Sequence, residues 1–500
     1  MTVISNTVTP MKTIGGFGFL WALGCVVAGT ASASSFNNSS DLQTWVTQQR
    51  PVAVDRLFQA ISPADGAPGA VMASPSRSHP DYYYHWIRDA ALVMKEVYRV
   101  KGERPNQSMS TLLDYARFSR RNQLMPNPSG TASDYGLGEP KFMINGDAYM
   151  PGWGRPQNDG PAIRAMVLTR LAFDLLNQGK GDVVSQILYR GEIPASTVIK
   201  ADLEYVAHHW QDSNFDLWEE IYGDHFYTRI VQYRGLIEGA RLARFLNDSG
   251  AADFYERQAG LIHDSLNAFW NPSKGYFDAT IRRRGGAAHK SSQLDVAVIL
   301  GVLHAEFDTG AFSIEDSRVL ATALRLEEAF RALYPINHFP ADVAPAIGRY
   351  PEDTYDGYGT DGRGNPWFLA THALAEFYYK LAVKTADQAT TITVTKENRK
   401  VVQSSTGGNY LVGATLSTTD RLKLAQSFFA KAESFLARSK YHTPVGGSQD
   451  EQINRDTGAP QGARDLTWSY ASFISLYEAR ETALKKLPAS VLAITSDSAE

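Results

Sequence analysis

The sequence predicts an all-α fold, a toroid of helices with one shared pocket at one end. Apolar residues recur with the helical period of 3.6 residues in about a dozen segments of the 500-residue chain. Long loops rich in Gly, Pro, Asp and Trp separate these segments, and five loops that enter helices carry aromatic and charged residues. Because functional groups concentrate on loops held by a rigid scaffold, we expect these five loops to meet in one pocket.

The loops and the helices after them set the expected order of elements. The loops cover residues 85–89, 151–159, 214–224, 348–366 and 446–464. Helices are expected at residues 89–100, 163–175, 226–246, 367–381, 422–436 and 466–477. Asp159 is expected to cap the second helix, and Asn365-Pro366 to form the N-cap and first residue of the fourth. Residues 390–402 alternate polar and apolar and predict a small surface hairpin.

The first 33 residues have the pattern of a signal peptide. Lys12 is their only charge, residues 13–29 are apolar, and Ala31-Ser32-Ala33 offers a small-residue cleavage site. An uncleaved signal anchor is the alternative. We predict a secreted, extracellular protein whose mature chain, residues 34–500, is a single domain. No later stretch is apolar for long enough to span a membrane, so no membrane association is expected.

Cysteine use and charge exclude several kinds of site. The only cysteine, Cys25, lies inside the predicted signal peptide, so the mature chain is expected to have no disulfide, thiolate catalyst or cysteine zinc site. The net charge is −4 and no basic run occurs, which argues against nucleic acid as a partner. Acceptor sites for N-glycosylation fit a secreted glycoprotein and occur at Asn37, Asn38, Asn106 and Asn247.

No cofactor and no metal are predicted. Residues 357–362 match the GxGxxG nucleotide fingerprint, but no strand precedes them and the next helix starts several residues late. A calcium loop at Asp353, Asp356 and Asp361 is conceivable but has no standard spacing. The chain also has no HExxH, Walker or nucleophile-elbow motif.

Two segments place carboxylates beside aromatic residues, the combination that sugar chemistry needs. Residues 215–220 read Phe-Asp-Leu-Trp-Glu-Glu, and residues 446–470 hold Glu451 in a Gly-rich loop before an aromatic-rich helix start. Aromatic faces cover the apolar side of a pyranose ring, and two carboxyl groups handle the protons of glycosidic cleavage. Glu219 and Glu220 cannot form that pair, because adjacent side chains point apart. The hypothesis is a glycoside hydrolase whose acid and base come from different segments.

Each candidate residue also has a simpler explanation. As a general acid, Glu219 needs a raised pKa, which a partly desolvated site lined by Trp218 would supply. The alternative is a solvated first turn of a helix, where acidic residues are common. Glu451 would act as a general base, or it is an ordinary loop carboxylate. Arg88 and Asp89 either clamp sugar hydroxyl groups or form a structural ion pair in which Asp89 caps a helix.

Taken together, these segments resemble the glucoamylases, glycoside hydrolase family 15. The resemblance runs from about residue 73 to the last expected helix, nearly the whole mature chain. Several long motifs occur in the family's order: Pro80–Asp89, Gly136–Phe142, Trp153–Ala162, Asp216–Glu220, Gly348–Tyr355, Gly364–Leu369 and Ala463–Tyr470.

The resemblance implies an (α/α)6 toroid and an inverting exo-hydrolase that releases β-glucose from non-reducing ends of α-1,4-glucans, and more slowly from α-1,6 branches. It implies that Glu219 is the general acid, Glu451 the general base, and Tyr82 the residue that positions the attacking water. The terminal glucose and its neighbour would be bound by Arg88, Asp89, Glu220 and Arg349. The pocket would be completed by the aromatic residues Trp86, Trp153, Trp367, Trp468 and Tyr355 and by the backbone of Gly154 and Leu217.

The expected partners are starch, dextrins and malto-oligosaccharides, bound by a monomer. The chain departs from the family in three respects. Typical fungal relatives carry disulfides, Gly462 stands where many relatives have Ser near the base, and residues 356–364 form a longer loop beside Arg349. No separate starch-binding domain is expected, so action on granular starch should be weaker than on soluble dextrins.

Two other functions stay open. One is an inverting toroid hydrolase that acts on trehalose, isomaltose or dextran-like glucans, with residues 356–364 as the discriminating feature. The other is a secreted sugar-binding protein with a dead site, which the presence of both Glu219 and Glu451 disfavours.

Overall fold

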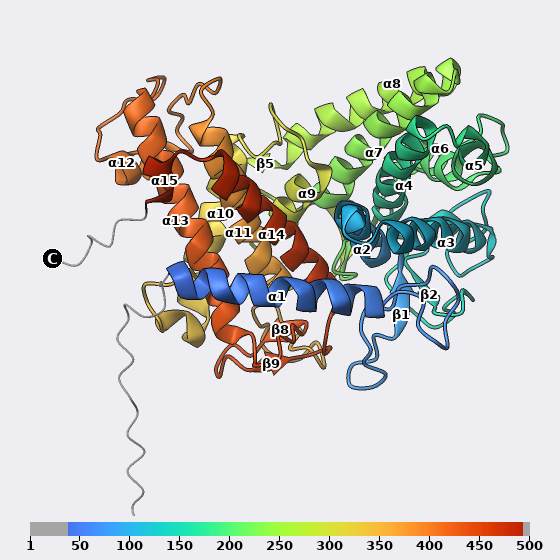
Figure 1. The fold of residues 1–500 in the computed structure, drawn as a ribbon, viewed down its shortest axis with the longest axis horizontal. Coiled ribbons are helices and arrows are strands. Elements are labelled where there is room, and N and C mark those ends of the chain that lie inside the picture. Colours follow the sequence, from blue (N-terminus) through green and yellow to red (C-terminus); the bar gives the residue numbers. More distant parts are fainter. Residues whose placement is uncertain (1–38, 494–500) are drawn as a thin grey trace, which may run out of the picture.

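The computed structural model describes residues 39–493, and the contacts between its helices arrange them in two concentric rings. Figure 1 shows the helices with their labels. In the inner ring each helix packs against the next, and the last closes on the first. The inner helices are α2 (Ile87–Arg99), α4 (Gly160–Asn177), α7 (Phe226–Phe245), α9 (Ala297–Ala305), α11 (Phe368–Ala386) and α14 (Thr467–Lys486). The predicted signal peptide, with Cys25, Asn37 and Asn38, lies outside the described residues.

The outer ring covers the inner one. Its helices are α1 (Ser39–Gln59), α3 (Pro105–Leu124), α6 (Val198–His209), α8 (Ser249–Leu266), α10 (Ser317–Leu333) and α13 (Thr418–His442). Each of them packs against an inner helix, and the chain alternates strictly between outer and inner helices from α1 to α14. This alternation confirms the all-α class and the (α/α)6 toroid.

Short elements fill the connections. The short helices are α5 (Gly181–Val183), α12 (Arg399–Thr406) and α15 (Ala489–Leu492), with 3-10 turns at Val100–Gly102, Gly136–Gly138, Asn267–Phe269 and Pro335–His338 and a π turn at Val184–Leu188. The strands are β1 (Tyr84–Trp86), β2 (Lys141–Met143), β3 (Asn214–Phe215), β4 (Ile221–His225), β5 (Trp270–Asn271), β6 (Tyr276–Phe277), β7 (Thr280–Gly286), β8 (Gln452–Ile453) and β9 (Pro460–Gln461). They pair antiparallel as β1-β2, β3-β4-β7, β5-β6 and β8-β9.

The alternation also places all inner helix N-termini at one end of the toroid, because each inner helix runs opposite to the outer helix before it. Six loops therefore enter the ring at that end, one more than the five predicted. The additional loop, residues 288–296, precedes α9 and lacks the run of aromatic residues that marks the other five.

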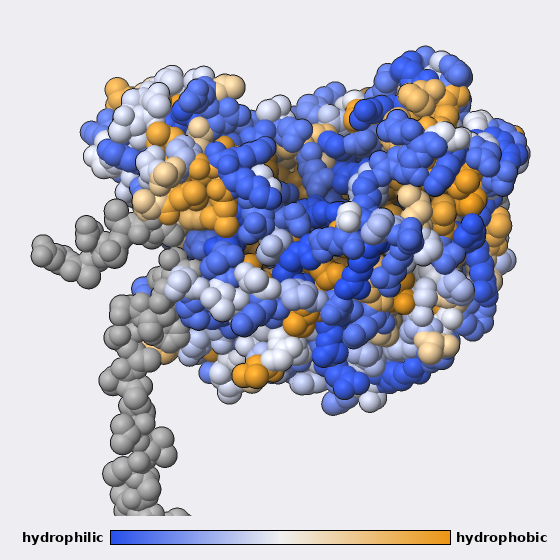
Figure 2. Space-filling model, viewed as in Figure 1, coloured by the Kyte–Doolittle hydropathy of each residue, from blue (hydrophilic) through white to orange (hydrophobic). Residues whose placement is uncertain are grey.

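The inner helices form the core, since they are surrounded on nearly all sides. In α11, which the sequence predicts to be apolar almost all round, Phe377, Tyr378 and Tyr379 are fully buried. The hydroxyl groups of the two tyrosines are bound to Glu327 and Glu433 from neighbouring helices, so burial leaves neither hydroxyl unpaired. On the face shown in Figure 2, apolar side chains form small, separate patches among polar ones, as is typical of a water-exposed surface. Among residues 39–493, no helix is long and apolar enough to cross a membrane.

Three local predictions are wrong. Helix α11 begins at Phe368, two residues after Pro366, and the Asn365 side-chain oxygen accepts the backbone N–H of Arg455 (3.0 Å) instead of capping a helix. Asp159 occupies the N-cap position of α4, as predicted, so this prediction is wrong only in part: its carboxylate binds Arg88 and accepts no backbone N–H as a cap. The predicted hairpin at residues 390–402 is a single bridge between Thr393 and Thr415, followed by α12.

Candidate active site

A cavity of about 320 Å³ lies at the end of the toroid where the inner helices begin. Its lining contains both predicted catalytic glutamates and all twelve predicted substrate-binding residues: Glu219, Glu451, Tyr82, Trp86, Arg88, Asp89, Trp153, Gly154, Leu217, Glu220, Arg349, Tyr355, Trp367 and Trp468. Trp218, Thr360 and Leu466 complete it. The fold thus gathers residues from five separate loops into one cavity.

The two glutamates enter this cavity from opposite sides of the ring. Glu219 precedes α7 and Glu451 precedes α14. Around the inner ring, α7 and α14 are three steps apart in either direction, through α9 and α11 or through α4 and α2. The carboxylates therefore face the cavity from opposed walls, as separate acid and base groups require.

Glu219 lies in a tight turn between β3 and β4, not at a helix start. The Asp216 carboxylate accepts the backbone N–H groups of Glu220 (2.8 Å) and Ile221 (3.0 Å), which closes the turn. Glu219 has φ of 67°, a left-handed conformation that costs a non-glycine residue free energy and often marks a functional position. Gly154 lies so close to this turn that a Cβ atom there would be 2.7 Å from the Glu219 carbonyl oxygen. The approach of the two loops therefore requires glycine at position 154.

The Glu219 carboxylate is held by an indole and an amide. Trp86 Nε1 donates to Glu219 Oε1 (2.7 Å), and Gln157 Nε2 donates to the same oxygen (3.1 Å). Arg88 Nη2 is 3.9 Å from it. The tryptophan bonded to the acid is therefore Trp86, while the indole of Trp218 donates to Asp295 (3.1 Å). Trp218 lines the same cavity as Glu219, as predicted, although the indole bonded to Glu219 is that of Trp86.

Arg88 and Asp89 lie in the first turn of α2, which begins at Ile87, so Asp89 is not its cap. Arg88 Nη1 donates to Asp159 (2.8 Å) and Gln157 (2.9 Å), and these bonds orient the guanidinium toward the cavity. Burial raises the pKa of Asp89 to about 7, although the charge of Arg88 opposes this shift. The Arg88 Nε atom is buried and lies 3.9 Å from an oxygen of Asp89.

Glu451 is fully buried, and two tyrosines stand over it. Tyr355 OH donates to Glu451 Oε2 (3.3 Å), and the hydroxyl groups of Tyr355 and Tyr82 are 2.9 Å apart. Burial raises the pKa of Glu451 to about 7, while hydrogen bonds from Tyr82 and Tyr355 lower it. Glu451 Oε1 has no hydrogen-bond partner among the described residues. A carboxylate beside two tyrosine hydroxyl groups in a cavity lining can accept a proton from a water molecule that those hydroxyl groups hold.

Gly462 packs closely against the carboxylate of Glu451. Its φ is 75°, and a Cβ atom there would lie 2.4 Å from Glu451 Oε2. The serine that many relatives carry at this position would need both the carboxylate and the backbone to shift here.

A second ion-pair group forms the wall beside Glu220. Arg349 Nη2 donates to Glu220 Oε1 (2.7 Å) and to Asp353 Oδ1 (2.6 Å). Tyr350 OH donates to the other Glu220 oxygen (2.5 Å). Burial raises the pKa of Glu220, and Arg349 opposes that shift. Both oxygens of Asp353 are bonded to Arg349, so this residue is not available as the first ligand of a calcium loop. Residues 39–493 hold no group of three or more His, Cys, Asp or Glu placed for a metal.

Sequence reasoning missed several residues that hold the site together. Gln157 bridges Arg88 and Glu219, and Lys141 Nζ lies 3.7 Å from the ring centre of Trp153 and 4.4 Å from that of Trp86. Burial lowers the pKa of Lys141 to about 8. Both residues lie inside motifs that carry the family resemblance, and this position could have marked them as part of the site. Asp295 lies in the unpredicted sixth loop, and no sequence feature points to it.

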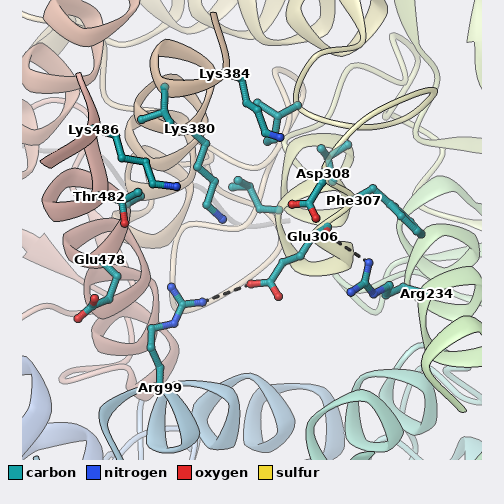
Figure 3. Close-up of a pocket in the computed structure, with 15 residues that line it drawn as sticks. Arg99, Arg234, Glu306, Phe307, Asp308, Lys380, Lys384, Glu478, Thr482 and Lys486 are labelled. Carbon is teal, nitrogen blue, oxygen red and sulfur yellow. Dashed lines mark hydrogen bonds and ion pairs between the residues drawn. The ribbon is translucent and has the colours of Figure 1, made fainter. Parts of the chain in front are cut away.

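A larger cavity, about 450 Å³, lies at the other end of the toroid, where the inner helices end. Figure 3 shows Arg99 pointing at Glu306 among the side chains that line it. Glu306 also pairs with Lys95 (2.9 Å) and Arg170 (2.6 Å), and these cations hold its pKa well below the usual value. Glu306, kept ionised in this way, is not suited to act as a general acid. The cavity at the N-terminal end contains all the predicted site residues and is therefore the candidate active site.

Comparisons with known proteins agree with this assignment. A family description, "Glycosyl hydrolases family 15", matches residues 52–478. A glucoamylase of Blastobotrys adeninivorans is 38% identical over 474 residues, which are 90% of this chain and 74% of that protein. An intracellular, sporulation-specific glucoamylase of Saccharomyces cerevisiae is 33% identical over 481 residues, 90% of this chain and 86% of that protein. The structure of a glucoamylase from Saccharomycopsis fibuligera has a TM-score of 0.80 and 31% identity, covering 90% of this chain and 97% of that chain. The chain therefore belongs to family 15 of the glycosyl hydrolases and is a glycoside hydrolase of the glucoamylase type.

Proposed function

We propose that this protein is an exo-acting, inverting glucoamylase that releases β-D-glucose from non-reducing ends of starch, dextrins and malto-oligosaccharides. The observation that carries the proposal is the entry of Glu219 and Glu451 from opposite sides of the inner ring into one cavity. Inverting glycosidases keep their two carboxyl groups about 6.5–9.5 Å apart so that a water molecule fits between sugar and base. Opposed walls favour that separation over the shorter one of retaining enzymes.

In this proposal Glu219 donates its proton to the glycosidic oxygen as the bond from C1 to that oxygen breaks. A water molecule attacks C1 from the opposite face, and Glu451 accepts the proton that the water loses. The configuration at C1 is inverted, so an α-linkage gives β-glucose. Tyr82 and Tyr355, whose hydroxyl groups meet beside Glu451, hold the water in line with C1.

The rest of the lining supports recognition of a chain end. Arg88, Asp89, Glu220 and Arg349 are charged groups that can bind sugar hydroxyl groups by charge-assisted hydrogen bonds. Trp86, Trp153 and Trp468 supply aromatic faces for pyranose rings. A cavity of about 320 Å³ holds one or two sugar units, so only a terminal unit would reach the acid and base. Cleavage of α-1,6 bonds is expected to be slower, because a branch presents the leaving oxygen at a different angle.

Secretion is part of the proposal and rests on the signal-peptide pattern of residues 1–33. Asn106 and Asn247 are exposed and could carry glycans, while the S. cerevisiae relative bears the description intracellular. N-terminal sequencing of protein recovered from the medium tests it: a start at or near residue 34 supports secretion, and retention inside the cell contradicts it. We further propose one catalytic domain over residues 34–500 and a monomer, which light scattering of the purified protein would test.

Proton NMR of purified protein with maltoheptaose would test the activity. Early β-glucose, with the heptamer shortened one unit at a time, is the expected result. Early α-glucose or mid-chain products would overturn the inverting or the exo assignment. Relative rates on maltose, isomaltose and trehalose separate this function from the related α-glucan hydrolases, and absence of any product would favour a sugar-binding protein.

A further inference from the structure

Two aromatic rings pack together outside the proposed catalytic machinery. Tyr358 and His79 are stacked, with ring centroids 5.3 Å apart and planes inclined by 18°. Tyr358 is 50% exposed, and His79 is exposed as well. Neither ring lines the cavity. A tyrosine that remains half exposed although its ring is fixed by a stacked neighbour is available to a ligand.

The stacked pair belongs to the same two loops that form one wall of the cavity. Tyr82 and Tyr355 join two loops deep in the site, beside Glu451. His79 and Tyr358 join the same two loops again, each three residues along the chain from its deep counterpart. Thr360, two residues beyond Tyr358, lines the cavity. The exposed pair therefore continues the wall of the cavity outward to its rim.

The loop that carries Tyr358 is held by its own hydrogen bonds and by the neighbouring segment at residues 461 and 462. Asp356 Oδ1 accepts the backbone N–H groups of Tyr358 and Gly359 (both 2.9 Å). Gln461 Nε2 donates to the Asp356 carbonyl oxygen (2.6 Å), and Gly357 packs so closely on Gly462 that a Cβ atom would lie 2.8 Å from its Cα atom. Because the loop is fixed before a ligand binds, a ring on it loses little entropy on binding.

We propose that Tyr358, backed by His79, is a stacking platform for a glucose unit of an α-glucan that extends out of the cavity. The cavity holds the units next to the scissile bond, and the remaining chain must pass the rim. The apolar face of a pyranose packs on an exposed tyrosine ring as it does on the buried aromatic residues. This inference rests on the proposed function, and it makes residues 356–364 a determinant of preference for longer chains.

Steady-state kinetics on maltose and maltoheptaose with Tyr358→Ala and Tyr358→Phe tests the platform. For Tyr358→Ala we expect kcat/KM on maltoheptaose to fall by about two- to ten-fold, mainly through KM, with maltose unchanged. Tyr358→Phe keeps the ring and should remain near wild type. The control is Phe245→Ala, which removes a comparably exposed ring (59%) at the C-terminal end of α7, on the far side of the toroid. It should leave kcat/KM unchanged on both maltose and maltoheptaose.

Two outcomes would overturn the inference. An equal fall for maltose and maltoheptaose would mean that the ring only supports the loop beside Glu451, and no change for either would mean that it binds no sugar. If wild type cleaves neither sugar, the proposed function fails, and calorimetry with maltoheptaose becomes the separate measurement. Weaker binding by Tyr358→Ala than by wild type would then still support the platform, and equal binding would refute it.

Discussion

At the residue scale, the two glutamates differ in how far water reaches them. The Glu219 side chain is 18% exposed and is bonded to an indole and an amide, whereas Glu451 is fully buried under two tyrosines. An acid must reach the glycosidic oxygen between two sugar units, and a base must shelter a single water molecule. These surroundings are consistent with the proposed roles, in which Glu219 is the acid and Glu451 the base.

Replacing the acid tests this assignment. Glu219→Gln keeps the size and the hydrogen bond from Trp86 but cannot donate a proton as an acid does. We expect kcat on maltoheptaose to fall by at least about 10³-fold, with Kd for the sugar changed little. Calorimetry would give the Kd, and Glu192→Gln, on an exposed loop, is the control. Near-normal turnover would remove Glu219 from the mechanism.

The tyrosine over the base predicts a change in pH dependence. Tyr355→Phe removes a hydrogen bond that stabilises ionised Glu451 and lowers its pKa. Because the base must be ionised, the acidic limb of the kcat/KM profile should move to higher pH, by about one unit. Full pH profiles of both proteins on maltose would show it. A limb that stays in place, or moves to lower pH, would contradict the proposed role of Glu451.

At the scale of elements, the β3–β4 turn sets the direction of the acid. Asp216 closes the turn through two backbone N–H groups, and its other oxygen lies 3.6 Å from the buried Lys290. Lys290 in turn binds Asp295, which accepts the indole N–H of Trp218. The turn, the loop before α9 and the cavity wall are thus joined by one buried polar network, in which each group restrains the next.

A matched pair of variants tests that network. Asp216→Asn keeps an oxygen that can accept the two backbone N–H groups, whereas Asp216→Ala does not. We expect kcat/KM to fall by about ten-fold or less in Asp216→Asn and by about 100-fold or more in Asp216→Ala, because misplacement of a catalytic group is costly. Kinetics on maltoheptaose, with circular dichroism to confirm folding, is the measurement. Equal activity in the two variants would show that the turn does not depend on this side chain.

At the scale of the whole molecule, closing the ring buries titratable groups on the inner helices. Burial raises the pKa of Glu96 in α2 to about 7, although Arg99 opposes the shift, and lowers the pKa of His372 in α11 to about 3. The two shifts act on stability in opposite senses. Between pH 4.5 and 7 the folded protein retains a proton at Glu96 that the unfolded chain releases, while His372 stays neutral where the unfolded chain would be charged.

The contribution of Glu96 can be isolated. Its folded pKa lies above its unfolded value, so the stability it contributes is complete below about pH 4.5 and is lost as pH rises through 7. Glu96→Gln removes this loss. The Tm of the variant relative to that of wild type should therefore rise by a few degrees between pH 5 and pH 8, as measured by calorimetry. Glu328→Gln, on an exposed ion pair, should show a constant difference, and a constant difference for Glu96→Gln would contradict the prediction.

The local sequence predicted where helices lie better than it predicted how they begin. The stripe of Leu422, Phe429 and Leu436 lies within α13, since the helical period survives in any helix that is buried on one side. The side chains of Asp159 and Asn365 do not cap their helices, because their oxygens accept from residues distant in the sequence, Arg88 and Arg455. A capping residue satisfies whichever donor the tertiary structure brings closest, and the sequence nearby does not contain that information.

The sequence by itself determined the helical class, the alternation of helices with decorated loops, and the candidate site residues that the fold gathers into one cavity. These depend on local period and on residue types, and a resemblance across nearly the whole chain added their expected roles. Only the tertiary structure decided which groups meet: that Trp86, not Trp218, binds Glu219, that Gln157 bridges Arg88 and the acid, and that α7 and α14 stand opposite each other. The physical reason is that ring closure brings together residues hundreds of positions apart, and their distances, burial and pKa values exist only once the ring has formed.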